Sequence, residues 1–202
     1  MKNDKSVLGR SFFEHKTVVV AQDLLGKFLV RKIGKNIIAG MVVETEAYVG
    51  PHDLACHASK GKTERTKVMF ESAGTWYVYM IYGMYHCLNI VTEDKDYPSA
   101  VLIRALEPVV IPSLERRGKR GGLLSEPTNG PGKLCRALKI DKKFNCTSAV
   151  AKNSQLYFED RGVKISRNKI VKAKRIGVDY AGKWKDKPLR FYIRGNKFIS
   201  KT

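Results

Sequence analysis

One stretch near the middle of the chain limits the fold more than any other. Residues 74–90 read GTWYVYMIYGMYHCLNI, in which two aromatic and β-branched runs flank Tyr82, Gly83 and Met84. Two such runs joined by a short link that contains glycine predict a β-hairpin. The tip of a hairpin normally faces water. Either the tyrosine and methionine at this tip form a wedge that inserts into a partner, or the tip folds back under a neighbouring loop.

Short strand patterns recur on both sides of this hairpin. They occupy residues 28–33, 37–43, 41–49, 100–106 and three pieces of the last fifty residues. Helices are expected to begin near Val18, after Pro108 and after Asn129. Residues 51–73 are polar and indicate a loop with short helical turns. Because no repeat or linker divides the chain, we expect one α+β domain over residues 1–202, built mainly from antiparallel strands.

The charge balance points to the kind of partner. Lysine and arginine number 38 against 19 aspartates and glutamates, which gives a net charge of +19. Such a chain favours a polyanion, because each neutralised phosphate releases counterions. An anionic membrane surface is the competing partner, but no strongly amphipathic basic helix supports it. We therefore expect a nucleic acid partner and no membrane association.

Cysteine usage and the N-terminus bear on the compartment. The cysteines are widely spaced without a CxxC pair, which disfavours zinc and iron–sulfur sites and predicts reduced thiols, two or more of them buried. They are Cys56, Cys87, Cys135 and Cys146. The first residues, MKNDKSVLGRSFFEHK, lack the apolar region of a signal peptide, and no apolar run reaches the length of a membrane span. We expect a cytoplasmic protein without metal or cofactor, associated with the nucleoid if the cell is bacterial.

Two carboxylates lie close together in the strand pattern MVVETEAYVGP. Alternate side chains of a strand share a face. Glu44, Glu46 and Tyr48 then lie on one face, opposite an apolar core face that includes Val43. Two carboxylates beside an aromatic ring suit general acid–base chemistry in a pocket. A solvent-facing strand whose glutamates balance nearby lysines and arginines explains this stretch equally well.

Other polar and aromatic residues in the apolar strands allow two interpretations each. An isolated histidine such as His57 is usually structural or solvated. Tyr77 and Tyr79 share one face of their strand, and a core position is favoured for Tyr77. Asn89 and Arg104 interrupt apolar strand sequences, and a polar group buried in such a strand must find a partner. Each of these two either makes a structural contact or faces a site.

Two basic segments are candidates for phosphate contacts. The first, NGPGK, ends in Lys133 and opens a predicted helix, where backbone N–H groups could meet a phosphate. The second contains Arg116, Arg117, Lys119 and Arg120 and could follow a sugar–phosphate backbone. Glycines before a helix are common, and a run of charges is more often a solvated face.

Taken together, these features fit enzymes that act on a base within a duplex. Such enzymes extrude the nucleotide, fill the gap it leaves and hold the base between aromatic faces. Apolar wedges inserted from the minor groove are one way to unstack a duplex. A basic surface, an exposed wedge and carboxylates beside aromatic rings meet these needs.

The order of several motifs resembles one family. The motifs are VVETEAYVGP, the spaced His57, GTWYVYMIYGMYHCLNI, VLIRALEP, NGPGKLCRAL and KPLRFYIRG. From about residue 10 to the end they resemble the 3-methyladenine (alkyladenine) DNA glycosylases, typified by the mammalian enzyme. The resemblance implies a curved, mainly antiparallel sheet with surrounding helices and a protruding β-hairpin. The segment between His57 and Met69 is shorter than in the mammalian enzyme and the 116–128 loop differs, so phosphate contacts there are not carried over.

The resemblance also implies catalytic roles. Glu46, in ETEAY, matches the general base that activates water against C1′ of the damaged nucleotide. Arg104, in LIRALEP, resembles the arginine that helps to hold this water. Tyr82 matches the residue that intercalates through the minor groove and takes the place of the flipped nucleotide.

The same resemblance implies a base pocket. Tyr48 and Tyr79 match two aromatic walls on opposite sides of the base. His57 matches a further wall that also forms hydrogen bonds near the sugar or phosphate. Asn89 looks like the residue that discriminates against normal guanine by its exocyclic amine.

The resulting prediction is a monofunctional DNA glycosylase. It would act as a monomer on double-stranded DNA and hydrolyse the N-glycosidic bond of damaged purines of the 3-methyladenine type, with hypoxanthine and ethenoadenine as further candidates. No lysine lies in the pocket motifs to form a Schiff base. The alternative is a non-catalytic basic module of the same fold that binds DNA or RNA. A metal-dependent nuclease is disfavoured, because Asp, Glu and His clusters are scarce apart from Glu44 and Glu46.

Overall fold

The computed structural model describes residues 6–109 and 127–201. Within these residues, all strands belong to one antiparallel sheet with the order β1-β7-β2-β3-β6-β5-β4, and the β8–β9 pair joins it through β3. The strands are β1 (Ser6–Val7), β2 (Phe28–Ile33), β3 (Asn36–Tyr48), β4 (Trp76–Ile81), β5 (Tyr85–Val91), β6 (Ala100–Pro108), β7 (Leu156–Asp160), β8 (Ile170–Ala173) and β9 (Arg190–Ile193). The predicted α+β class and mainly antiparallel sheet are confirmed.

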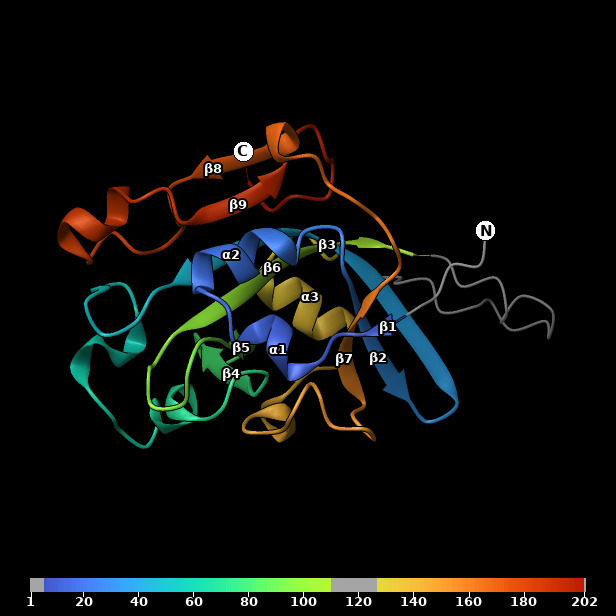
Figure 1. The fold of residues 1–202 in the computed structure, drawn as a ribbon, viewed down its shortest axis with the longest axis horizontal. Coiled ribbons are helices and arrows are strands. Elements are labelled where there is room, and N and C mark those ends of the chain that lie inside the picture. The colour runs from blue at the N-terminus through green and yellow to red at the C-terminus, as the bar shows by residue number, and fades with distance from the viewer. Residues whose placement is uncertain (1–5, 110–126, 202) are drawn as a thin grey trace.

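In the described part of the chain, three short α-helices cover one face of the curled sheet (Figure 1). They are α1 (Arg10–Phe13), α2 (Thr17–Asp23) and α3 (Pro131–Ala137). Their apolar sides meet the sheet in one main core, in which Phe13, Leu24 and Leu134 pack with strand residues such as Trp76 and Phe158. None of the helices in residues 6–109 and 127–201 is both long and apolar enough to span a membrane.

Strand β3 holds the sheet together because it changes partners along its length. Its first part pairs with β2 and its second part with β9, while β6 pairs with its other edge from Gly40 to Tyr48. The register with β6 shifts on both sides of Glu44, which marks a β-bulge. Residues 44–46 are therefore hydrogen-bonded on both edges and lie in the middle of the sheet.

Glu44 and Glu46 share one face of β3, as simple alternation predicts, because Arg104 contacts both carboxylates. Val42 and Val43 are both buried in the main core. Glu44, Thr45 and Glu46 have no exposed surface at all. Alternation fails only beside the bulge, where the extra residue places Val42 in the core next to Val43. A solvent-facing strand is thereby excluded for both glutamates.

Most other elements lie where the sequence predicts them. β2 pairs with β3 and β4 pairs with β5, as both predicted hairpins require. The polar segment 51–73 contains only short 3₁₀ turns, at His57–Lys60 and Lys67–Phe70. Three of the four cysteines are buried and all four are free thiols, as predicted. The helix expected after Pro108 lies outside the described residues.

A glycine at the centre of the sheet makes the packing testable. A Cβ atom on Gly40 would lie 2.8 Å from the Cβ of Leu106, which is fully buried. We expect Gly40→Ala to lower the free energy of unfolding by about 1–3 kcal/mol, because the tightly packed strands must move apart. Urea unfolding measures the change. Gly9→Ala is the matched control, since no atom lies within 4 Å of its added Cβ; equal stability of the two variants would contradict this packing.

Candidate active site

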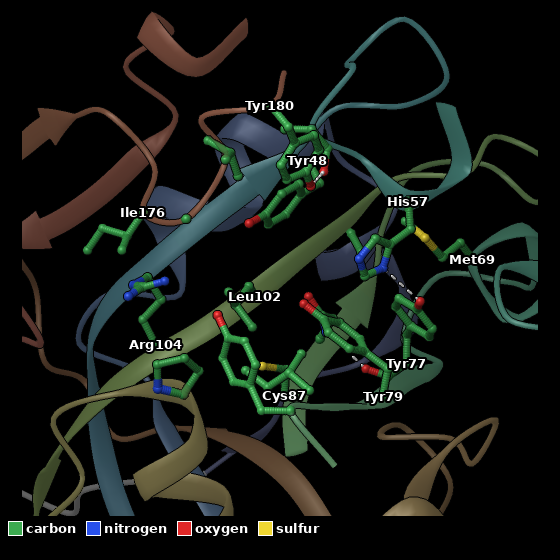
Figure 2. Close-up of a pocket in the computed structure, with 18 residues that line it drawn as sticks. Tyr48, His57, Met69, Tyr77, Tyr79, Cys87, Leu102, Arg104, Ile176 and Tyr180 are labelled. Carbon is green, nitrogen blue, oxygen red and sulfur yellow. Dashed lines mark hydrogen bonds between the residues drawn. The ribbon is translucent and has the colours of Figure 1, made fainter. Parts of the chain in front are cut away.

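A cavity of about 350 Å³ opens where the second half of β3 meets β4, β5 and β6. Its aromatic lining comes from Tyr48 at the end of β3, His57 in the following 3₁₀ turn, and Tyr77 and Tyr79 of β4. In Figure 2, Tyr48 lies above the open centre and Tyr79 below it, with Arg104 on the left and His57 on the right. The rings therefore bound a space on several sides, which suits a flat ligand.

The carboxylate of Glu46 is fixed directly behind this lining. Its Oε1 accepts a hydrogen bond from the backbone N–H of Ile176 at 2.8 Å and lies 3.2 Å from Nη1 of Arg104. Its Oε2 accepts a hydrogen bond from the hydroxyl of Tyr48 at 2.9 Å. Glu46 is completely buried, but all three of its partners line the cavity. The arrangement keeps a desolvated negative charge at the cavity wall.

Arg104 reaches this carboxylate because a second carboxylate holds it from the other side. Its Nε donates to Oε1 of Glu44 at 3.2 Å, and its Nη2 donates to Oγ of Ser200. Glu44 also accepts from Nη1 of Arg190 at 3.0 Å and from the backbone N–H of Ser200. Burial acts to lower the pKa of Arg104, but Glu46 and Glu44 together raise it above its ordinary value. Arg104 therefore stays charged inside the protein.

The segment that supplies the Ile176 N–H is anchored by a buried ion pair. Arg175 and Asp53 have no exposed side-chain surface and form a two-pronged contact. The guanidinium of Arg175 also lies 4.8 Å from the ring centroid of Tyr48. The pKa of Tyr48 is raised well above its usual value by burial and by the nearby charge of Glu46. Its hydroxyl therefore keeps the proton that it donates to Glu46.

The opposite wall is uncharged at neutral pH. Nδ1 of His57 lies 2.9 Å from the hydroxyl of Tyr77, and its ring meets Tyr79 edge-on at 4.6 Å. Burial, together with the charge of Arg65, lowers the pKa of His57 to about 4. Burial raises the pKa of Tyr77 to about 12. His57, an isolated histidine in the sequence, is thus part of a rigid aromatic wall.

The sequence allowed Asn89 and Arg104 either a structural contact or a place in a site, and in the structure each has both. Nδ2 of Asn89 donates to the backbone carbonyl of Tyr77 at 3.1 Å, and Asn89 also lines the cavity. Arg104 likewise combines ion pairs with a place in the lining. Tyr77 was expected in the core, and although it is buried it lines the cavity as well.

Tyr82 lies at the tip of the β4–β5 hairpin and is 86% exposed. Tyr82 and Gly83 both have positive φ angles, 52° and 68°, and the N–H of Met84 donates to the carbonyl of Ile81. These features define a type I′ turn. A tyrosine at positive φ is uncommon, so the turn holds it outward at some conformational cost. The alternative prediction, in which the hairpin tip folds back under a neighbouring loop, is therefore wrong for the described residues.

Of the basic residues predicted to contact phosphates, Lys133 alone lies within the described residues. Lys133, in the first turn of α3, is exposed and its Nζ donates to Oδ1 of Asn129. Arg116, Arg117, Lys119 and Arg120 lie outside the described residues.

Sequence reasoning missed the segment from Ile176 to Tyr180. It lies 130 positions from Glu46 in the chain, yet it provides a backbone donor to that carboxylate and part of the cavity lining. A backbone N–H leaves no signature in a side-chain pattern. The only sequence signal for this segment was the short stretch RIGVDY, which interrupts a strand-like pattern.

Comparisons with known proteins identify the family of the chain. The profile of the methylpurine-DNA glycosylases matches residues 11–197. A protein of Legionella pneumophila (strain Lens) is 50% identical over 195 residues, covering 96% of this chain and 98% of its own. Relatives from Methanocella arvoryzae and Clostridium perfringens (strain 13 / Type A) are 48% and 46% identical, again over 96% of this chain, and cover 96% and 98% of their own chains. All three carry the provisional name of 3-methyladenine DNA glycosylase.

The class that these findings define is a DNA repair enzyme of the DNA glycosylase type. The chain belongs to the methylpurine-DNA glycosylase family.

The depressed pKa of His57 makes stability depend on pH in a defined direction. In the unfolded chain the imidazole takes up a proton below about pH 6.5, whereas in the folded protein it does so only near pH 4. Its contribution is therefore complete above pH 6.5 and is lost as the pH falls toward 4. We expect the free energy of unfolding of wild type to fall over this window by about 1–3 kcal/mol more than that of His57→Gln. Urea unfolding at several pH values measures it, and parallel curves would contradict the assignment.

Proposed function

We propose that this DNA glycosylase is monofunctional and hydrolyses the N-glycosidic bond of damaged purines that it flips out of duplex DNA. The observation that carries the proposal is the buried carboxylate of Glu46, held by Arg104, Tyr48 and the N–H of Ile176 at the wall of an aromatic cavity. The cavity volume of about 350 Å³ falls within the range of small-molecule pockets. Its substrates would be purines of the 3-methyladenine type, together with hypoxanthine and ethenoadenine.

In this proposal Glu46 acts as the general base. Cleavage of an N-glycosidic bond passes through a sugar with oxocarbenium character. A fixed negative charge beside C1′ stabilises that sugar, and the carboxylate accepts the proton of the attacking water. A carboxylate has about four lone-pair sites. Three partners contact Glu46, so one site remains for water, which Arg104 would help to orient.

The aromatic lining supports recognition of an extruded base. Tyr48 and Tyr79 would hold the base between their faces, and His57 would close a third side. Electron-poor rings stack well on electron-rich faces. Asn89 lines the same space, with its amide nitrogen already donating to the carbonyl of Tyr77. In this fixed orientation it would discriminate against the exocyclic amine of normal guanine.

The exposed hairpin tip supports the flipping step. Tyr82 is 86% exposed and also borders the cavity. It would enter the minor groove and fill the gap left by the flipped nucleotide. Flipping costs less for a damaged or mispaired base, so lesions would be sampled preferentially. One flipping site needs no symmetry, and we propose that the enzyme acts as a monomer.

The lack of an amine nucleophile supports hydrolysis without strand cleavage. No lysine is among the residues that line the cavity in the described part of the chain. Glycosylases that also cut the strand use an amine that forms a Schiff base. The product would therefore be an abasic site.

The test of the function is base release under single-turnover conditions and without added metal. Duplexes carrying 3-methyladenine, hypoxanthine or ethenoadenine are incubated with excess wild-type enzyme. We expect release of at least one base and an intact strand, with no protein–DNA adduct after borohydride treatment. A trapped adduct would contradict the monofunctional mechanism. Tight, salt-sensitive binding without any release would favour a non-catalytic DNA- or RNA-binding module.

The wedge role of Tyr82 predicts a difference between duplex and single strand. We expect Tyr82→Ala to weaken binding to lesion duplexes by about tenfold, the value of one lost base–aromatic stack. Its affinity for the same lesion in a single strand should change much less, because no gap needs filling there. Tyr82→Phe keeps the ring and serves as the matched control. Equal losses on duplex and single strand would rule the wedge out.

A further inference from the structure

Arg65 stacks on the outer side of the proposed base pocket. It lies in the polar segment after His57, it is exposed, and its guanidinium carbon is 5.1 Å from the ring centroid of Tyr79. Tyr79 lines the cavity but Arg65 does not. Arg65 instead borders a separate surface cleft that it shares with Tyr77 and Tyr79. The cation therefore faces the ring from the side turned away from the cavity.

The charge of Arg65 is not compensated locally, unlike the other charges around the cavity. Three carboxylates and three guanidinium groups pair with one another there: Glu44, Glu46, Asp53, Arg104, Arg175 and Arg190. Arg65 forms no ion pair with any residue in 6–109 or 127–201, and the neighbouring Glu64 is paired with Lys67 instead. The paired set adds no net charge, whereas Arg65 adds one positive charge beside the aromatic wall.

This charge acts on groups that face the cavity. After burial, the charge of Arg65 is the next cause of the lowered pKa of His57. Arg65 also contributes a hydrogen bond that acts to lower the pKa of Tyr77, against the larger opposite effect of burial. A base stacked on Tyr79 would lie within the same field, which solvent weakens in part because Arg65 is exposed.

The two kinds of damaged base differ by one unit of charge throughout the reaction, so such a field stabilises them to different extents. When the N-glycosidic bond breaks, its electron pair stays on the ring nitrogen, while water adds to C1′ and gives its proton to Glu46. An uncharged base such as hypoxanthine therefore departs with developing negative charge, which a nearby cation stabilises. A base that is already cationic, such as 3-methyladenine, still carries part of its positive charge in the transition state and departs neutral. A nearby cation therefore disfavours its binding and does not stabilise its transition state relative to the free enzyme and free DNA.

We propose that Arg65 is a specificity-determining residue that favours uncharged lesion bases over cationic alkylated bases. This inference rests on the proposed function, because it assumes that the cavity holds the departing base. The inference concerns the ratio of the excision rate of an uncharged base to that of a cationic base. Each rate is a kcat/KM value, which compares the transition state with the free enzyme and free DNA. The charge of Arg65 stabilises the departing uncharged base and disfavours a base that still carries positive charge.

The experiment compares excision of hypoxanthine and 3-methyladenine from the same duplex sequence at enzyme concentrations well below saturation, so that each rate reports kcat/KM. We expect Arg65→Gln to lower the ratio of the hypoxanthine rate to the 3-methyladenine rate by about three- to tenfold, the scale of one charge that is partly screened by solvent. Arg65→Lys keeps the charge and should keep most of the ratio. Because each ratio compares two bases on one protein, a uniform loss of folding or of DNA binding cancels.

The matched control is Lys62→Gln. Lys62 is exposed in the same segment and lies 5.1 Å from the ring of Phe70, which does not line the cavity. We expect its ratio to equal that of wild type. An unchanged ratio in Arg65→Gln, or an equal change in Lys62→Gln, would overturn the inference while leaving the proposed function in place. Failure of wild type to release either base would overturn both.

Discussion

Two buried carboxylates on β3, bridged by one arginine, are the constraint on which the rest of the structure depends. Glu44 and Glu46 have no exposed surface, and Arg104 contacts both. Buried charges are costly unless they are paired and hydrogen-bonded, and removing one partner leaves an uncompensated charge. The strands β6 and β9 must therefore pair with β3 at this point, because they bring Arg104 and Arg190 to the carboxylates.

The same constraint gathers distant parts of the chain around the cavity. Ser200 joins the carboxylate of Glu44, and the N–H of Ile176 joins that of Glu46. Each contact spans more than 100 residues of sequence, so the site forms only when the whole sheet has formed. A carboxylate held in this way loses little freedom during a reaction. Such preorganised groups stabilise developing charge without reorganising at the moment of reaction.

The sequence predicts the elements better than it predicts the connections between them. The β4–β5 hairpin follows from local pattern, and the motifs of the family resemblance supply several residues of the cavity lining, among them Tyr48, His57 and Tyr79. The bulge at Glu44 is hidden, because alternation assumes a regular strand. The contact from Ile176 is also hidden, because a backbone donor is independent of residue type. Arg65 gives no local signal at all, since its effect depends on the ring beneath it and on the absence of a carboxylate partner among the described residues.

The most direct measurement of the central claim is single-turnover base release by Glu46→Gln, beside wild type, on one lesion duplex. Glutamine keeps the size of the side chain but removes its charge and its ability to take a proton. We expect the release rate to fall by about 10²–10⁴-fold, the usual contribution of a general base, while the variant stays folded, because Arg104 keeps its pair with Glu44, and its duplex affinity stays close to wild type. Release at the wild-type rate by a folded Glu46→Gln variant would contradict the account.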